Sequence, residues 1–159
     1  MPVVLPPELR AVIPTGKRLF GVDVGSKTLG LALSDLGWRI ASPYKTLARK
    51  KFSVDAAELF RLIAQENVGG LVVGLPVSME GGKSSSTQSV QEFVKNILKL
   101  QDMPVAFWDE RLSTMAVSRM MIDEMDLSRK RQGLLVDKLA ASYILQGCLD
   151  SLPQSLSRN

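Results

Sequence analysis

The stretch Gly21-Val-Asp-Val-Gly-Ser-Lys-Thr-Leu-Gly-Leu-Ala-Leu-Ser-Asp35 decides the fold of this 159-residue chain. Two apolar runs, at about 17–24 and 29–35, are separated by the turn residues Gly25 to Thr28, a pattern that predicts an antiparallel hairpin. One carboxylate, Asp23, lies among the apolar residues of the first run. Burying a carboxylate in an apolar strand costs free energy unless a cation or another partner compensates it. Asp23 is therefore the first candidate for a functional residue.

The remaining sequence predicts one compact α/β domain. Strands are expected at 39–47, 71–76 and 104–108, helices at 53–67, 86–100, 113–124 and 136–151, and a basic loop at 126–135. Ser53 is the expected N-cap of the first helix, Gly69-Gly70 its end, and Pro43 suggests an edge strand or a bulge. Three antiparallel strands followed by strand–helix alternation give a five-stranded mixed sheet flanked by helices. We expect residues 1–16 to be a loosely ordered, Pro-rich lead-in, 17–151 to be the domain, and 152–159 to be a tail.

The composition restricts the chemistry that an enzyme of this sequence could use. The chain has no histidine and one cysteine, Cys148, which excludes His-based triads, His-ligated zinc, multi-cysteine zinc sites and an internal disulfide. An enzyme would have to use carboxylates, cationic side chains, hydroxyls or a hard cation held by oxygen. The net charge of +4 permits an acidic partner such as nucleic acid but does not establish one. Without a run of about 20 apolar residues or a secretory signal, we expect no membrane contact and a cytoplasmic location.

Two further positions carry acids where they could serve a site. Counting back by three and four from the expected buried face of the last helix puts Asp137 on that face; the face comprises Ala140, Ala141, Ile144, Leu145 and Cys148. The alternative is a carboxylate favoured at a helix N-terminus by the helix dipole. Asp109 and Glu110 end the fifth strand, so alternation sends them to opposite faces and only one can join a shared site. The alternative for this pair is a surface turn.

These acids could converge on one edge of the sheet. Neighbouring carboxylates repel each other unless a cation lies between them. Ligation by oxygen alone suits Mg²⁺ or Mn²⁺ rather than zinc. Such a site can hydrolyse phosphodiesters with two ions about 4 Å apart.

Four motifs carry a resemblance to a known family. They are Gly21-x-Asp23-x-Gly25-Ser-Lys-x-x-Gly30-x-Ala32-x-Ser-Asp35, Val73-Gly-Leu-Pro76, Trp108-Asp-Glu-Arg-Leu-Ser113 and Val136-Asp-Lys-Leu-Ala-Ala141. Over about residues 17–150 the chain resembles the YqgF/RuvX family, bacterial proteins with an RNase H-like fold described as Holliday junction resolvases and as pre-16S rRNA processing nucleases. The resemblance implies that Asp23, Glu110 and Asp137 are catalytic acids that bind divalent metal, Mg²⁺ or Mn²⁺ and expected as two ions, whereas Asp109 faces away.

Cationic residues near these motifs are candidates for phosphate contacts. Lys27 in the hairpin turn, Arg111 beside Glu110, and the run Arg129-Lys130-Arg131 could bind substrate, because backbone phosphates need only well-placed cations. The alternative for the run is a solvated charge cluster. Trp108 is interpreted as a core residue rather than as a base-stacking platform.

The functional hypothesis is a metal-dependent endonuclease acting on structured nucleic acid. The resemblance favours processing of the 5′ end of pre-16S rRNA in ribosome biogenesis, with ribosomal particles as further partners. One alternative is a Holliday junction resolvase in DNA recombination and repair, which would need a symmetric dimer; the sequence itself leaves monomer and homodimer open. Others are a non-catalytic RNA-binding assembly protein, and an ATP-binding domain, since Asp23-x-Gly25-Ser-Lys-Thr28 also resembles the first phosphate loop of the actin and sugar-kinase group.

Overall fold

The computed structural model describes residues 3–76, 85–110 and 129–153. In the helices, the side chains of residues 85–86 and 129–138 are outside this description. The helix expected at 113–124 also lies outside the described residues.

A five-stranded sheet forms the centre of the molecule, with the strand order β3-β2-β1-β4-β5. The strands are β1 (Arg18–Val24), β2 (Thr28–Ser34), β3 (Ala41–Ala48), β4 (Val68–Leu75) and β5 (Val105–Asp109). β2 pairs antiparallel with β1 and β3, whereas β4 pairs parallel with β1 and β5. The predicted hairpin and mixed sheet are confirmed, and β3 is an edge strand whose register shifts next to the pair formed by Ala32 and Pro43.

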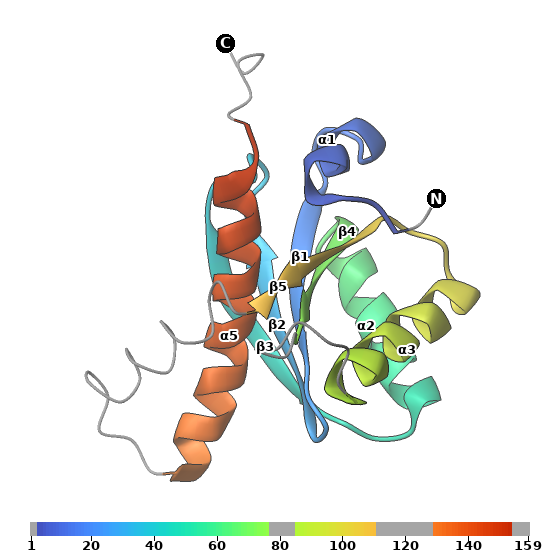
Figure 1. Cartoon of the computed structure of the whole chain (residues 1–159), viewed down its shortest axis with the longest axis vertical. Coiled ribbons are helices and arrows are strands. Elements are labelled where there is room, and N and C mark those ends of the chain that lie inside the picture. The colour runs from blue at the N-terminus through green and yellow to red at the C-terminus, as the bar shows by residue number, and fades with distance from the viewer. Residues whose placement is uncertain (1–2, 77–84, 111–128, 154–159) are drawn as a thin grey trace.

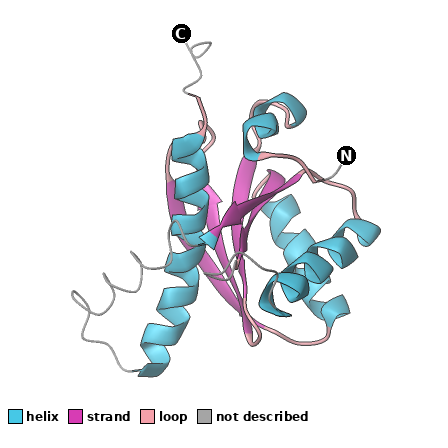
Figure 2. Ribbon diagram, in the orientation of Figure 1, coloured by secondary structure: helices cyan, strands magenta, loops and turns pink. Residues whose placement is uncertain are grey.

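Helices cover both faces of this sheet, so the molecule has three layers (Figures 1 and 2). The helices are η1 (Pro6–Glu8), α1 (Leu9–Val12), α2 (Phe52–Gln65), α3 (Ser85–Leu100) and α5 (Arg129–Ser151). Helices α2 and α3 lie on one face, and α5 lies on the other. In the described part of the chain no helix is both long and apolar enough to cross a membrane.

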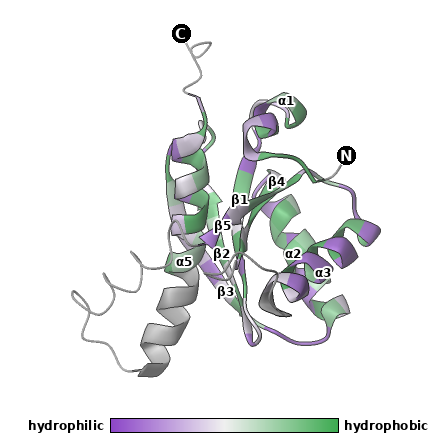
Figure 3. Ribbon diagram, viewed as in Figure 1, coloured by the Kyte–Doolittle hydropathy of each residue, from purple (hydrophilic) through white to green (hydrophobic). Residues whose placement is uncertain are grey.

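The alternation of β1 supplies two hydrophobic cores, one on each face. Phe20 and Val22 belong to the core under α2 and α3, whereas Leu19 belongs to the core under α5. The predicted buried face of the last helix is confirmed, since its members are all buried: Ala140, Ala141, Ile144, Leu145 and Cys148. Figure 3 shows hydrophobic residues concentrated in the sheet and in the helices that pack on it.

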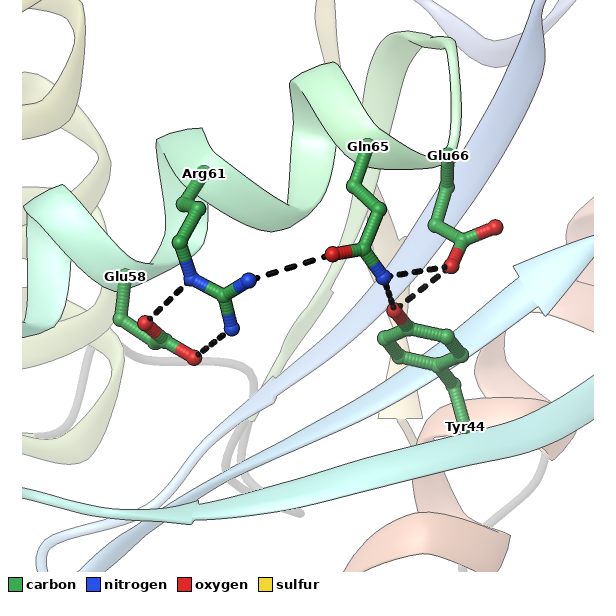
Figure 4. Close-up of polar contacts among 5 residues, drawn as sticks. All are labelled: Tyr44, Glu58, Arg61, Gln65 and Glu66. Atoms are coloured by element: carbon green, nitrogen blue, oxygen red, sulfur yellow. Dashed lines mark hydrogen bonds and ion pairs between the residues drawn. The ribbon is translucent and has the colours of Figure 1, made fainter.

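A polar network joins the edge strand β3 to the end of α2 (Figure 4). The hydroxyl of Tyr44 donates to a carboxylate oxygen of Glu66 over 2.8 Å, and Gln65 also donates to Glu66. Burial and this hydrogen bond to Glu66 raise the pKa of Tyr44, and the same bond lowers the pKa of Glu66. One turn earlier, Arg61 forms an ion pair with Glu58.

Two expectations for the region around α2 are wrong. The N-cap of α2 is Lys51 rather than Ser53, since the carbonyl of Lys51 accepts the first helical N–H groups, those of Val54 and Asp55. Gly69 and Gly70 lie inside β4 instead of ending the helical unit. Asn67, which has a positive φ of 57°, makes the turn after α2, so the chain is already extended when it reaches the glycines.

The lead-in and the start of the last helix also differ from expectation. Residues 3–16 pack on the domain, since the N–H of Val4 donates to the carbonyl of Val105 and Leu9 is fully buried. Helix α5 begins at Arg129 rather than near 136, so Arg129-Lys130-Arg131 is helical and not part of a loop. Arginine, lysine, glutamine and leucine are good helix formers, which explains the longer helix.

Candidate active site

Asp23 lies near the carboxyl end of β1, on the face of the sheet that α5 covers. Two residues earlier, a Cβ atom on Gly21 would lie 2.6 Å from the carbonyl oxygen of Ala141 and 2.7 Å from the Cβ of Leu145. Gly21 therefore faces α5 directly. Because side chains two residues apart share a face of a strand, Asp23 is on the α5 face as well.

Glu110 reaches the same face from the end of β5. A Cβ atom on Gly74 of β4 would lie 2.9 Å from Cγ and 3.2 Å from Cδ of Glu110, so the Glu110 side chain lies directly over Gly74. Val22 pairs with Val73, and one step further along both strands Gly74 comes beside Asp23. Since neighbouring strands are about 4.8 Å apart, the two acids meet at one edge of the sheet.

Asp109 belongs to the opposite face. It is in register with Leu75 of β4, and Leu75 packs against the core under α2 and α3. Residues in register on parallel strands share a face, so Asp109 and Glu110 diverge as strand alternation predicts.

Asp23 is half-buried, not fully buried as its apolar neighbours in the sequence suggested. Its partner across the β1–β2 pair is Gly30, which has no side chain to cover it, and Gly74 lies on its other side. Glu110 is half-buried too. The desolvation cost at Asp23 is therefore smaller than the sequence suggested, and a ligand can reach both carboxylates.

Helix α5 runs antiparallel to β1. Leu19 packs in one core with Cys148 and Leu149, whereas Gly21 faces Ala141. The distance from Gly21 to Asp23 is about 6.7 Å along the strand. Because the helix runs the opposite way, the four residues from Ala141 back to position 137 span a similar length, about 6 Å along the helix. Position 137 of the helix is thus level with Asp23.

The predicted set of three acids is brought together only in part. Among the side chains that the structure describes, no group of three acidic or cysteine residues could hold a metal ion. Asp23 and Glu110 are described and adjacent, but the side chain of Asp137 lies outside the description. The third ligand stays a prediction.

The predicted phosphate contacts are also described only in part. Lys27 is exposed in the β1–β2 turn, next to the end of the strand that carries Asp23. Arg111 lies outside the described residues, and so do the side chains of the run Arg129-Lys130-Arg131. Trp108, interpreted as a core residue, is half-buried and packs on the α5 core.

Arg49 is a residue of this region that the sequence reasoning missed. Its guanidinium donates to the carbonyl of Gly25 over 2.7 Å, and its backbone N–H donates to the carbonyl of Lys27 over 2.8 Å. The Nε of Arg49 lies 3.7 Å from a carboxylate oxygen of Asp55, which is buried at the start of α2. Arg49 therefore connects the turn beside Asp23 to the start of α2. The only sign of this role in the sequence is the basic run Arg49-Lys-Lys.

The described donors suit a hard divalent cation. Asp23 and Glu110 present carboxylate oxygens from neighbouring positions in a half-buried setting. Oxygen ligands are those that Mg²⁺ and Mn²⁺ prefer. The fit rests on the chemistry of these donors and on their half-buried setting.

Comparison with known proteins also indicates a nuclease family. The family model described as "RuvX: Holliday junction resolvase" matches residues 17–151. A protein of Paramagnetospirillum magneticum is 52% identical over 151 residues, which cover 95% of this chain and 97% of that protein. A protein of Gluconacetobacter diazotrophicus is 48% identical, with 95% and 98% covered. Both relatives carry the provisional name pre-16S rRNA nuclease.

Solved structures confirm the predicted RNase H-like fold. Thermus thermophilus RuvC, in complex with a Holliday junction substrate, matches with a TM-score of 0.51 and 12% identity, covering 85% of this chain and 97% of RuvC. The fowlpox virus Holliday junction resolvase matches with a TM-score of 0.50 and 15% identity, covering 85% and 99%. At such identities the likeness concerns the fold alone.

Proposed function

Because this chain belongs to the RuvX family, we propose that it is a divalent-metal-dependent endonuclease that hydrolyses phosphodiester bonds in structured nucleic acid. The observation that carries the proposal is the meeting of Asp23 and Glu110 on one face of the sheet, over and beside Gly74. Two half-buried carboxylates at neighbouring positions are suited to holding hard cations against a phosphate.

Each residue has a defined role in this proposal. Asp23 and Glu110 would hold Mg²⁺ or Mn²⁺, as two ions, and Asp137 would complete the ligand set from helix α5. Bound there, the metal would activate water as the nucleophile and stabilise the leaving oxygen. Lys27, Arg111 and the run Arg129-Lys130-Arg131 would contact substrate phosphates.

The names of the relatives favour ribosomal RNA as substrate. We propose cleavage at the 5′ end of pre-16S rRNA during ribosome biogenesis in the cytoplasm, with residues 17–151 as the nuclease domain. The family description supports a second candidate, resolution of four-way DNA junctions. Paired cuts in a junction would need a symmetric dimer of this chain.

The decisive experiment compares Asp23→Asn with Asp109→Asn. Both variants change one carboxylate to an amide near the same strand ends, but only Asp23 lies on the α5 face. Cleavage of a labelled pre-16S rRNA fragment and of a four-way DNA junction is measured with Mg²⁺ or Mn²⁺. We expect Asp23→Asn to abolish cleavage with its fold retained, and Asp109→Asn to keep it.

The substrate that is cut decides between the candidates. Metal-dependent cutting of RNA alone supports rRNA maturation, whereas paired junction cuts by a dimer support resolution. If wild type binds RNA but cuts neither substrate, the chain is an assembly protein and the nuclease proposal is wrong. Equal loss of cleavage in both variants would contradict the assignment of Asp23.

A further inference from the structure

A basic hollow lies at the end of the sheet opposite the β1–β2 turn. It has a volume of about 770 Å³ and is lined by α1, the C-terminal end of α5 and the β2–β3 connection. Figure 1 shows two of the elements that line it, α1 and the C-terminal end of α5, at the upper end of the molecule. Three cations line it: Arg10 and Lys17 from the N-terminal segment, and Arg39 from the β2–β3 connection.

Arg10 is held in place before any ligand arrives. Its guanidinium carbon lies 4.4 Å from the centre of the Trp38 ring, and one guanidinium nitrogen donates to the carbonyl of Gly37 over 3.2 Å. Trp38 is itself fixed, because its indole N–H donates to the carbonyl of Lys17 over 2.8 Å. A guanidinium has five N–H donors, so this arrangement leaves donors for a ligand and reduces the entropy lost on binding.

The other charges of the hollow leave a cationic surplus. Lys17 is oriented by a 2.8 Å hydrogen bond from Nζ to Asn67. Asp35 is the one carboxylate among the lining residues, and it accepts the backbone N–H groups of Arg39 and Ile40 over 2.7 and 3.0 Å. Asp35 therefore stabilises the turn that carries Arg39. The lining of the hollow has three cationic side chains and one anionic side chain.

From this arrangement we infer that the hollow is a second contact site for the phosphate backbone of nucleic acid, separate from the acids. The inference rests on the proposed function. It also sets the minimum length of nucleic acid that can contact both sites. Lys17 precedes Asp23 by six residues of mostly β structure, about 20 Å at strand spacing. Phosphates along one strand of a B-DNA duplex are about 3.4 Å apart along its axis and are closer in A-form RNA, so the substrate spans at least about six nucleotides between the two sites.

The test measures how binding depends on salt and on substrate length. Labelled RNA hairpins with stems of about 5 and about 15 base pairs are titrated in EDTA with the full chain, because each lost phosphate contact reduces the salt slope by about 0.9. The variant is Arg39→Gln, and the matched control is Arg61→Gln, which removes the same charge from the exposed surface of α2. Thermal unfolding of each variant verifies that the fold is retained.

Arg39→Gln should reduce the salt slope for the long hairpin by about one and weaken its binding roughly fivefold to tenfold at 0.1 M salt. The short hairpin, which cannot reach both sites, should bind equally well to Arg39→Gln and wild type. Arg61→Gln should leave both hairpins unchanged.

Three results would overturn the inference. The first is an unchanged slope for Arg39→Gln with the long hairpin, while wild type still binds and cuts RNA; in that case the proposed function survives. The second is a rise in wild-type Tm with inorganic phosphate that Arg39→Gln abolishes, without any dependence on hairpin length, which assigns the hollow to a free phosphate. The third, no binding of either hairpin by wild type and no cleavage, removes the inference and the proposed function together.

Discussion

Gly74→Ala should remove most of the cleavage activity at little cost in stability. The new methyl group would contact the Cδ1 atom of Ile144 and lie 2.9 Å from the Cγ atom of Glu110. The Cδ1 atom is the far end of the Ile144 side chain, and Glu110 is only half-buried, so we expect the low end of the usual overpacking cost, about 1 kcal/mol. In a domain of this size that free energy corresponds to a fall in Tm of about 2–4 °C.

The activity should fall much further, because Glu110 is the group that must move. Carbon atoms in ordinary contact are about 3.5–4.0 Å apart, so Glu110 would shift by roughly half an ångström or more. Misplacing a reacting group by about 1 Å can cost about 10²-fold in rate. We therefore expect kcat to decrease between tenfold and a hundredfold, roughly, as measured on the RNA or junction substrate that wild type cuts.

Gly21→Ala is the matched comparison, since it adds the same methyl group on the same face. Its neighbours are the carbonyl oxygen of Ala141 at 2.6 Å and the Cβ of Leu145 at 2.7 Å. These atoms cannot rotate away, so α5 itself must shift, and the cost should approach about 3 kcal/mol. The fall in Tm should be roughly three times that of Gly74→Ala.

Two outcomes would refute this reasoning. Wild-type kcat in Gly74→Ala, with the variant folded, would show that the position of Glu110 over Gly74 does not matter for cleavage. A larger loss of Tm in Gly74→Ala than in Gly21→Ala would show that the two sites differ in packing from the contacts described above.

Three further predictions concern other parts of the molecule. Arg49→Met, which frees the carbonyl of Gly25 and leaves a buried carboxylate without its ion pair, should lower Tm and raise KM, and Arg49→Lys should restore part of both. Because the folded pKa of Glu66 is lowered, its hydrogen bond from Tyr44 stabilises the protein at neutral pH and is lost as pH falls through that pKa; the Tm difference between Tyr44→Phe and wild type should thus shrink below about pH 4. Burial raises the pKa of Cys148 to about 12, so iodoacetamide at pH 8 should label it only after denaturation, as mass spectrometry would show.

Local patterns in the sequence predicted the elements whose neighbours lie nearby in the chain. The β1–β2 hairpin follows from two apolar runs around one turn, and the edge position of β3 follows from Pro43. The errors arise where contacts with residues far away in the sequence determine the local structure. Gly69 is in a strand because Lys17 and Ile13 pack over it, and the lead-in is ordered because Leu9 reaches the core under α5.

The same division applies to the candidate site. The apolar neighbours of Asp23 singled out that carboxylate, and strand alternation sent Asp109 and Glu110 to opposite faces, because both arguments use only residues adjacent in the chain. The roles of Gly74 and Arg49 could not be predicted in this way, since each depends on which strand or turn lies beside it. Val73-Gly-Leu-Pro76 is recognisable as a motif, but its glycine comes beside Asp23 and under Glu110 only through the parallel pairing of β4 with β1 and β5.

The candidate site includes two glycines as well as the acids. Asp23 has Gly30 across the hairpin and Gly74 on the parallel strand, so no Cβ atom on either neighbouring strand fills the space beside its carboxylate. Glycine in the interior of a strand destabilises a protein by roughly 0.5–1 kcal/mol relative to alanine, and at Gly74 the missing side chain lets Ile144 and Glu110 pack directly on the backbone of β4. The absence of a side chain at 74 therefore sets how closely Glu110 approaches the strand position beside Asp23. We therefore expect the distance between the two carboxylates, and with it cleavage, to depend on the residue at position 74, as Gly74→Ala tests.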